Sequence, residues 1–232
     1  MKKLIIVPAY NEERNIDGVL RAIRADAPGF DVVVVNDGSG DKTSDEARAF
    51  PFVQVIDLPV NLGIGGAVQT GFLYARALPY ELAVQDDGDG QHRPAEIEKI
   101  AGPILSGEAD VVIGSRFLEK ATFRGSPFRR AGIRIFQMIN ALFLGERITD
   151  STSGFRAFNR RAIEVLSESY PDDYPEPEAI YILKRRGLKI KEVPVEMNLR
   201  SGGKSSIGGG RSLYYMVKVC LAIFVLNLRK EI

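Results

Sequence analysis

Two aspartates separated by one glycine are the residues best suited to chemistry in this chain. Asp87-Gly88-Asp89 follows directly after an apolar run that predicts a buried strand. Two carboxylates at this spacing can hold one divalent cation through oxygen atoms, and the cation can bridge phosphate groups and stabilise a leaving diphosphate. An acidic turn is the alternative, because Asp and Gly are common in turns. The position after a strand and before Gln91-His92-Arg93-Pro94 favours a metal site.

A second polar group follows another predicted strand. Asp37-Gly38-Ser39 comes after four valines, and the Asp37 carboxylate can accept hydrogen bonds from the NH edge of a pyrimidine or from ribose hydroxyls. A turn with a helix cap is the alternative. Gly63, Gly65 and Gly66 open a predicted helix, whose backbone N–H groups can hold a phosphate or a base. Their spacing differs from the G-x-G-x-x-G pattern, so a dehydrogenase is not expected.

Three cationic side chains are candidates for phosphate binding. Arg116 follows the fifth predicted strand, with a surface ion pair as its alternative role. Arg200 and Lys204 lie in a Gly/Ser-rich segment, 200–211, and suit phosphate recognition unless this segment is a solvated loop. His92 is the single histidine of the chain. It is either a third metal ligand or a residue that packs beside the ligands.

Apolar runs alternate with helical patterns, which predicts an α/β fold with a doubly wound, mostly parallel sheet and helices on both faces. Polar clusters follow the first five strands, so five loops are expected to meet at one edge of the sheet, where such folds bind ligands. Asn11 and Asp41 are the predicted caps of the first two helices. The predicted strands are 3–8, 31–36, 53–57, 81–85, 110–114, 154–158 and 189–195, and the predicted helices are 12–26, 42–49, 64–78, 94–105, 159–167, 176–187 and 212–228.

The composition indicates one globular unit. The chain has 232 residues, 45% of them hydrophobic, and a net charge of +1, which argues against a nucleic-acid-binding protein. The single cysteine, Cys220, excludes an intramolecular disulfide and suits a reducing compartment. The first apolar run stops at Pro8 and is too short for a signal peptide, and no run approaches the ~20 apolar residues that cross a bilayer.

Seven motifs together resemble the family 2 glycosyltransferases, and more closely their polyprenyl-phosphate sugar transferase branch, of the dolichol-phosphate-mannose synthase type. The resemblance extends from near residue 4 to residue 206. It implies a GT-A fold and an enzyme that transfers a sugar from a nucleotide sugar with inversion, using Mg²⁺ or Mn²⁺. The motifs are PAYNEE (8–13), VVVNDGSGDKT (33–43), NLGIGGAVQTGF (61–72), QDDGDGQHRP (85–94), GSRF (114–117), TSGFRAFNR (152–160) and RSGGKSS (200–206).

The resemblance also implies roles for individual residues by motif match. The nucleotide would be lined by Pro8, Ala9, Tyr10, Glu12 and Asp37, with Gly65 among the glycines that could approach it. The metal ligands would be Asp87, Asp89 and Gln91, of which Asp87 also lies beside the donor. The groups that meet the acceptor phosphate or the donor diphosphate would be Arg116, Arg200 and Lys204. The acceptor side would be shaped by Ser153-Gly154-Phe155-Arg156.

The expected acceptor is polyprenyl (undecaprenyl) phosphate, and the expected donor is a UDP-sugar, for cell-wall or surface polysaccharide synthesis. The acceptor oxygen is already anionic near neutral pH, so alignment matters more than a strong base. A hydroxyl acceptor is the alternative and needs a base, for which Asp150, Glu176 and Glu178 are candidates. A sugar nucleotidyltransferase and a non-catalytic sensor are more remote alternatives. Processive synthesis is not expected, because its Q-x-x-R-W signature needs a tryptophan and the chain has none.

The expected organisation is a catalytic domain over residues 1–211, followed by an amphipathic helix over residues 212–232. Lys218, Arg229 and Lys230 suit lipid headgroups, so this helix is expected at a membrane interface or an oligomer contact. The basic segment 116–147, with seven Lys or Arg and two Asp or Glu, allows the same roles. These features predict a cytoplasmic protein peripheral to the membrane, with a small membrane protein or a second copy as partner and no nucleic acid.

Overall fold

The structure is a computed structural model, and it describes residues 1–118, 141, 148–171 and 175–198. The described helices and strands follow the predicted order. They are β1 Lys2–Ala9, α1 Ile16–Asp26, β2 Asp31–Asn36, α2 Thr43–Arg48, β3 Val53–Asp57, α3 Gly63–Ala77, β4 Tyr80–Gln85, the 3-10 turn η1 Pro94–Glu96, α4 Ile97–Leu105, β5 Val111–Ser115, β6 Arg156–Asn159, α6 Arg160–Glu168, α7 Pro175–Arg185 and β7 Ile190–Pro194.

The described strands form one seven-stranded sheet in the order β3-β2-β1-β4-β6-β5-β7. β6 runs antiparallel to both of its neighbours, and every other pair is parallel. The sheet is therefore mostly parallel, as predicted. Since β1 to β5 all point the same way, the loops that follow them meet at one edge, which confirms the predicted convergence.

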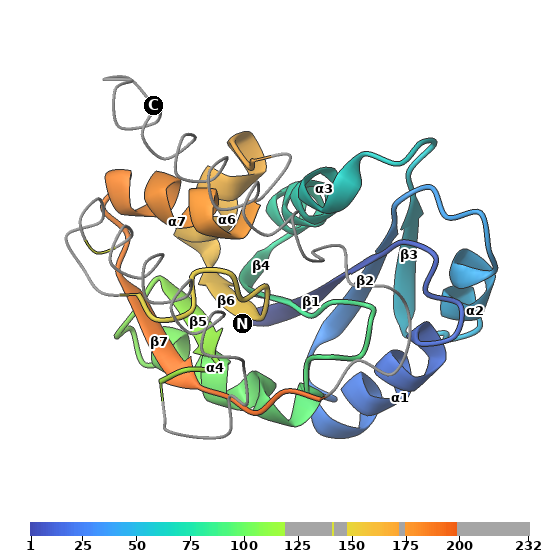
Figure 1. Ribbon diagram of the computed structural model, residues 1–232, viewed down its shortest axis with the longest axis horizontal. Helices are drawn as coiled ribbons and strands as arrows, with labels where there is room; N and C mark the ends of the chain where they lie inside the picture. Colours follow the sequence, from blue (N-terminus) through green and yellow to red (C-terminus); the bar gives the residue numbers. More distant parts are fainter. Residues whose placement is uncertain (119–140, 142–147, 172–174, 199–232) are drawn as a thin grey trace, which may run out of the picture.

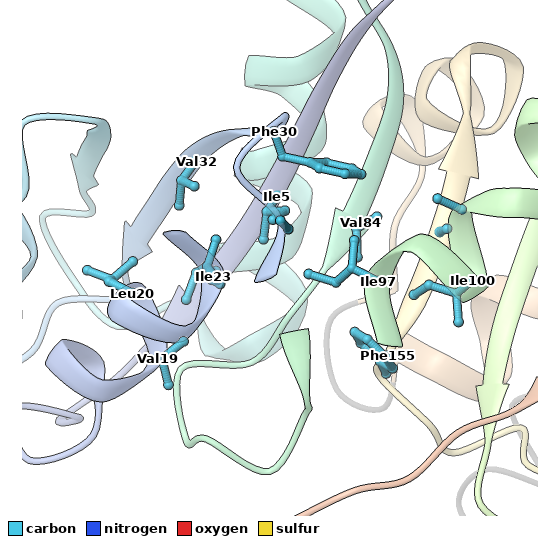
Figure 2. Packing of buried hydrophobic residues seen from close by; sticks show 14 of the residues in the cluster. Ile5, Val19, Leu20, Ile23, Phe30, Val32, Val84, Ile97, Ile100 and Phe155 are labelled. Carbon is cyan, nitrogen blue, oxygen red and sulfur yellow. The ribbon is translucent and has the colours of Figure 1, made fainter. Parts of the chain in front are cut away.

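Helices cover both faces of the sheet, with α1 and α4 on one side and α3, α6 and α7 on the other (Figure 1). Successive strand residues point to opposite faces, so Ile5 of β1 joins the cluster under α1 and α4, while Ile6 joins the cluster under α3 and α6. Figure 2 shows the first cluster, in which Ile5 and Val84 of the sheet face Ile23 and Ile97 of the helices. Burial on both faces explains the continuous apolar runs.

The predicted start of the first helix is wrong. α1 begins at Ile16, after Asn15, and Asn11 is not its cap. Asn11 instead has a φ of 55° and accepts a hydrogen bond from the N–H of Gly40 through Oδ1, while its own N–H donates to Ser39 Oγ. These bonds to the loop after β2 hold the chain in a turn. The predicted helix 94–105 is divided between η1 and α4, and the other boundaries agree within two residues.

Several sequence expectations lie outside the described residues. They include the helix predicted for 212–228, most of the basic segment 116–147, and the phosphate-binding candidates Arg200 and Lys204. The proposed division at residue 211 therefore stays a prediction. Among the helices that the structure describes, none has the length and apolar character that a bilayer crossing requires.

Candidate active site

Backbone hydrogen bonds join the segments that follow β2 and β4 to the end of β1. The N–H of Asp37 donates to Ala9 O (2.9 Å), and the N–H of Gly88 donates to Pro8 O (3.1 Å). A side chain at Gly88 would place its Cβ 3.1 Å from Pro8 O, so glycine allows the metal loop to lie against β1. The structure thus brings together the predicted nucleotide residues Pro8, Ala9 and Asp37 with the predicted metal loop.

Each carboxylate of the predicted metal pair accepts a hydrogen bond from a residue two positions away in the sequence. Asp87 Oδ1 accepts a hydrogen bond from Gln85 Nε2, and Asp89 Oδ1 accepts one from the N–H of Gln91, both at 3.0 Å. The N–H of Asp87 donates to His92 Nδ1, also at 3.0 Å. The His92 ring packs 4.8 Å from the ring of Phe155. His92 therefore accepts a hydrogen bond from the metal loop and packs against Phe155, which fits its interpretation as a packing residue.

Burial and nearby carboxylates shift the pKa values of Asp86 and His92, which lie beside the two predicted metal ligands. Asp86 is 1% exposed, and burial raises the pKa of its carboxyl above the ordinary value. Burial alone would lower the pKa of His92, but the carboxylates of Asp87, Asp86 and Asp89 outweigh it and raise that pKa. Three carboxylates therefore lie close together at this loop, and their combined negative charge favours a cation.

Asp37, the predicted nucleotide residue after β2, is buried and hydrogen-bonded within the fold. It is 3% exposed, and its Oδ1 accepts the N–H of Leu62 at 2.7 Å, at the start of α3. Burial raises the pKa of Asp37, against the hydrogen bonds from Leu62 and Gly63. Gly63 begins α3 with a φ of 81°, a conformation that favours glycine. Gly65 is buried in the first turn of α3.

The other two predicted nucleotide residues differ in their surroundings. Tyr10 is half exposed at the end of β1, so its ring is available to a ligand. The Glu12 carboxylate accepts a hydrogen bond from Asn15 Nδ2 at 2.6 Å, and its N–H donates to Thr43 Oγ1. Glu12 therefore helps to join the turn before α1 to the start of α2.

Arg116 and Asp150 form an ion pair just after β5. Arg116 Nε and Nη2 donate to the two Asp150 oxygens, each at 2.7 Å, and the N–H of Arg116 donates to Oδ2 at 3.0 Å. The Asp150 side chain is fully buried, whereas that of Arg116 is 37% exposed. Glu192 in turn accepts hydrogen bonds from the N–H groups of Thr149 and Asp150. Arg116 thus forms an ion pair, but its partner is buried and not at the surface as the alternative role had it, and the phosphate contact of Arg116 stays a prediction.

Arg156, which belongs to the predicted acceptor-side motif, is buried and donates hydrogen bonds to backbone carbonyl groups. It is 1% exposed and donates to the carbonyl oxygens of Ser151, Ser153 and Glu176 at 2.7–2.8 Å. It therefore fixes the turn before β6 to the start of α7. Burial raises the pKa of the Glu176 carboxyl, although the charge of Arg156 opposes this.

Comparison with known proteins decides the family. A family described as "Glycosyl transferase family 2" matches residues 4–167, more than half of the chain. This chain belongs to glycosyl transferase family 2. The UDP-N-acetylglucosamine–dolichyl-phosphate N-acetylglucosaminyltransferase of Methanococcus voltae is 34% identical to it, over 83% of this chain and 84% of that protein. The polyprenol monophosphomannose synthase of Mycolicibacterium smegmatis is 32% identical, over 94% and 85%.

A solved structure confirms the fold of this family 2 glycosyltransferase. Glucosyl-3-phosphoglycerate synthase from Mycobacterium tuberculosis, in a complex with Mn²⁺, UDP-glucose and phosphoglyceric acid, superposes with a TM-score of 0.74. The match covers 96% of this chain and 79% of that chain, at 23% identity. The superposition confirms the expected GT-A fold, and the family match and the two relatives confirm the glycosyltransferase activity class and the branch of the family that the motifs resemble.

The donor set of this glycosyltransferase fits a cation that a substrate helps to bind. Within the described residues, no three His, Cys, Asp or Glu side chains group together as a complete metal site. Asp87 and Asp89 nevertheless follow β4 at the binding edge. Mg²⁺ usually binds through one or two carboxylates together with substrate phosphates. A cation bound there would neutralise charge on a leaving diphosphate, while the loop residues orient the two carboxylates.

Two contributors to the site of this glycosyltransferase, Gln85 and Glu192, were not assigned a role from the sequence. Gln85 stands two residues before Asp87, and the two-residue period of a strand is a signal that could have placed them on the same side. Glu192 lies 43 residues from Thr149, and nothing in the spacing indicates their contact. Asp150 was one of three candidates for a base or a structural role, and both of its carboxylate oxygens accept hydrogen bonds from Arg116.

Proposed function

We propose that this enzyme transfers a sugar from a nucleotide sugar, a UDP-sugar, to polyprenyl phosphate with inversion at the sugar. Several relatives are named for transfer to this acceptor class, while the sugars in their names differ. The sugar is therefore left to experiment. Undecaprenyl phosphate is the acceptor that we propose, in cell-wall or surface polysaccharide synthesis.

The observation that carries this proposal is the pair of hydrogen bonds that Asp150 accepts from Arg116. Both of its oxygens receive hydrogen bonds from Arg116, so this carboxylate is poorly suited to remove a proton from an alcohol. A phosphate acceptor brings an oxygen that is already anionic and needs no strong base. The Arg116 guanidinium, fixed in direction and partly exposed, would instead bind a phosphate oxygen and align it with the donor.

The metal part of the proposal assigns the donor diphosphate to the loop after β4. Asp87 and Asp89, with Gln91 beside them, would hold Mg²⁺ or Mn²⁺. Solved structures of the same fold, namely glucosyl-3-phosphoglycerate synthase, contain either ion. Pro8, Ala9, Tyr10 and Asp37 would line the nucleotide, since they lie at the ends of β1 and β2.

The decisive experiment supplies the purified protein with Mn²⁺ or Mg²⁺, undecaprenyl phosphate in detergent, and a panel of UDP- and GDP-sugars. Mass spectrometry then detects a glycosylated lipid phosphate. We expect one donor to give product, and an Asp89→Ala variant to give none. Tight binding of a nucleotide sugar in the presence of metal, with no product from any donor, would point to a hydroxyl acceptor or to a missing membrane partner.

A hydroxyl acceptor is the second candidate, and Glu176 is the observation in its favour. Its pKa is raised by burial, and a carboxyl with a raised pKa is a better base near neutral pH. Glu176→Gln separates the two. With a phosphate acceptor the variant keeps most of its activity, whereas loss of a base lowers kcat by about a hundredfold or more.

The site of action follows from the proposed acceptor. A polyprenyl chain lies in a bilayer, so the reaction is proposed to take place at a membrane surface, with the protein bound peripherally. Co-sedimentation with anionic lipid vesicles tests this, and recovery in the supernatant would contradict it. A small membrane protein partner is also proposed, and full activity of the isolated chain without lipid or partner would argue against it.

A further inference from the structure

A buried glutamine lies directly behind the proposed metal ligand Asp87. Gln85 is the last residue of β4 and is 0% exposed. In the sheet it pairs with Ile6 of β1 and Arg156 of β6, so it is enclosed by a strand on each side. A polar side chain at such a position, at the end of an otherwise apolar strand, requires an explanation.

Strand geometry explains why Gln85 reaches Asp87. Val84 points into the cluster under α1 and α4 (Figure 2), whereas Ala83 joins the cluster under α3 and α6. By the two-residue period of a strand, Gln85 points to the same face as Ala83, and Asp87 follows two residues later. The Gln85 amide donates to Asp87 Oδ1 at 3.0 Å.

The amide oxygen of Gln85 indicates that this residue does not give the fold the greatest stability. Within the described part of the chain, Gln85 Oε1 is buried and has no hydrogen-bond partner. A buried polar atom in this state costs stability, and an apolar side chain of the same size would avoid that cost. The glutamine is therefore better explained by its contact with the carboxylate than by packing.

Gly154 provides an independent observation on the same pair. A Cβ at residue 154 would lie 3.0 Å from Gln85 Nε2 and 3.0 Å from Asp87 Oδ2. Any larger residue would therefore press on the amide and on the carboxylate together. Gly154 does not have a left-handed backbone conformation, so the space it leaves, and not its flexibility, explains why glycine suits this position.

We propose that Gln85 is a positioning residue, which holds the Asp87 carboxylate through Oδ1 in the orientation that binds a divalent cation, and that Gly154 leaves the space for this arrangement. The inference rests on the proposed metal site. Carboxylates that ligate metals are themselves held by hydrogen bonds, and loss of the outer partner lowers metal affinity about tenfold or more. The role involves no proton transfer, because the amide donates throughout.

The test measures Mn²⁺ binding by electron paramagnetic resonance in the presence of UDP, with no sugar donor and no acceptor. Gln85→Met removes the amide but keeps the length of the side chain, and we expect its Mn²⁺ affinity, per folded molecule, to fall about tenfold or more. Gln85→Leu is a second removal variant with a different shape. Gly154→Ala should weaken Mn²⁺ binding as well, because it presses on both groups.

Gln69→Met is the matched control. Gln69 is a partly buried glutamine of α3 whose amide donates to Ser167 O, away from the carboxylates, so its replacement should leave Mn²⁺ affinity unchanged. Saturating Mn²⁺ should also restore the turnover of Gln85→Met, which a general loss of structure would not allow.

Two outcomes separate this inference from the proposed metal site. If Asp87→Ala abolishes Mn²⁺ binding but both Gln85 variants bind within about twofold of the parent, a difference too small for an outer partner, Gln85 is not a positioning residue. If Asp87→Ala itself leaves Mn²⁺ affinity unchanged, the proposed metal site is wrong and the inference fails with it.

Discussion

Arg116 and Asp150 are joined by two parallel hydrogen bonds of 2.7 Å, although 34 residues separate them in the sequence. This arrangement fixes the plane of the guanidinium, while the Arg116 side chain is 37% exposed and Asp150 is fully buried. A planar, prealigned cation at the end of β5 suits a phosphate better than a flexible lysine would.

The first prediction concerns the role of Asp150 in catalysis. Asp150→Asn keeps the shape of the side chain but weakens its hold on Arg116, so we expect kcat/KM to fall about tenfold, as for a loss of about 1.4 kcal/mol. If Asp150 were the base, the loss would be about a hundredfold or more and the acidic limb of the pH–rate profile would disappear. Steady-state rates between pH 5 and 9 distinguish the two.

Asp110→Asn is the control for this substitution. Asp110 also has both oxygens in hydrogen bonds, to Asn159 Nδ2 and to the N–H of Lys189, but it precedes β5 at the opposite edge of the sheet. We expect this variant to lose stability without losing kcat/KM in the folded fraction. An equal loss of activity in both variants would indicate a general structural effect.

The second prediction concerns Glu192, whose carboxylate accepts three hydrogen bonds of 2.7–2.9 Å from Thr149 N, Thr149 Oγ1 and Asp150 N. Glu192→Gln places an NH₂ group against at least one of these donors, and we expect the free energy of unfolding to fall by about 2 kcal/mol. Urea denaturation measures this change.

A double-mutant cycle then tests whether Glu192 acts through Arg116. If it does, the activity losses of Glu192→Gln and Arg116→Lys are not additive, because each removes the same placement of the guanidinium. Additive losses would show that Glu192 does not act through Arg116. Glu168→Gln is the matched control, since Glu168 forms an exposed pair with Arg76, and it should change stability by less than about 0.5 kcal/mol.

Much of the fold follows from the sequence because the strands are buried on both faces. The run Asp31–Asn36 was predicted with its observed boundaries, since a continuous apolar run ends where polar residues meet solvent. The start of α1 was not predictable, because Asn11 and Asn15 are both suitable caps. The choice between them depends on bonds from Asn11 to Ser39 and Gly40, which local spacing does not reveal.

The candidate site, like the fold, was only partly predictable from the sequence. Asp37 and Asp87 follow parallel strands, so topology alone brings them to one edge. The contacts among Arg116, Asp150 and Glu192 depend on the pairing of β5 with β7, and no short-range pattern specifies that pairing. The sequence therefore placed residues at the strand ends better than it predicted the contacts that hold them.

The third prediction concerns the contact of α3 with the sheet. A Cβ at Gly71 would lie 2.3 Å from Ile6 Cγ2, and Ile6 is fully buried in β1. Gly71→Ala should lower the free energy of unfolding by about 1–3 kcal/mol through overpacking. Gly102→Ala in α4 is the control, because nothing lies within 4 Å of its Cβ position. It should gain up to about 1 kcal/mol from helix propensity, and equal effects of the two substitutions would contradict the packing argument.

The fourth prediction concerns pH and Asp37. Burial raises the pKa of Asp37 in the folded state above its unfolded value, so its contribution to stability is present below the unfolded pKa of about 4 and is lost as the pH rises through the folded pKa. Asp37→Asn can still accept the N–H of Leu62, and it has no charge to bury. We expect the variant to be more stable than the parent at pH 7, with the difference shrinking below about pH 4.

The same variant should bind UDP less tightly, because the proposed acceptor of nucleotide hydrogen bonds has lost its charge. Urea denaturation across pH 3–7 and UDP titration calorimetry measure the two effects. Asp26→Asn, at an exposed position that ends α1, controls for loss of a carboxylate and should change neither. A variant that is less stable at pH 7 would show that the hydrogen bonds to Leu62 and Gly63 outweigh the burial of the charge. An unchanged UDP affinity would instead remove Asp37 from the proposed nucleotide site, leaving it as the residue that fixes the start of α3.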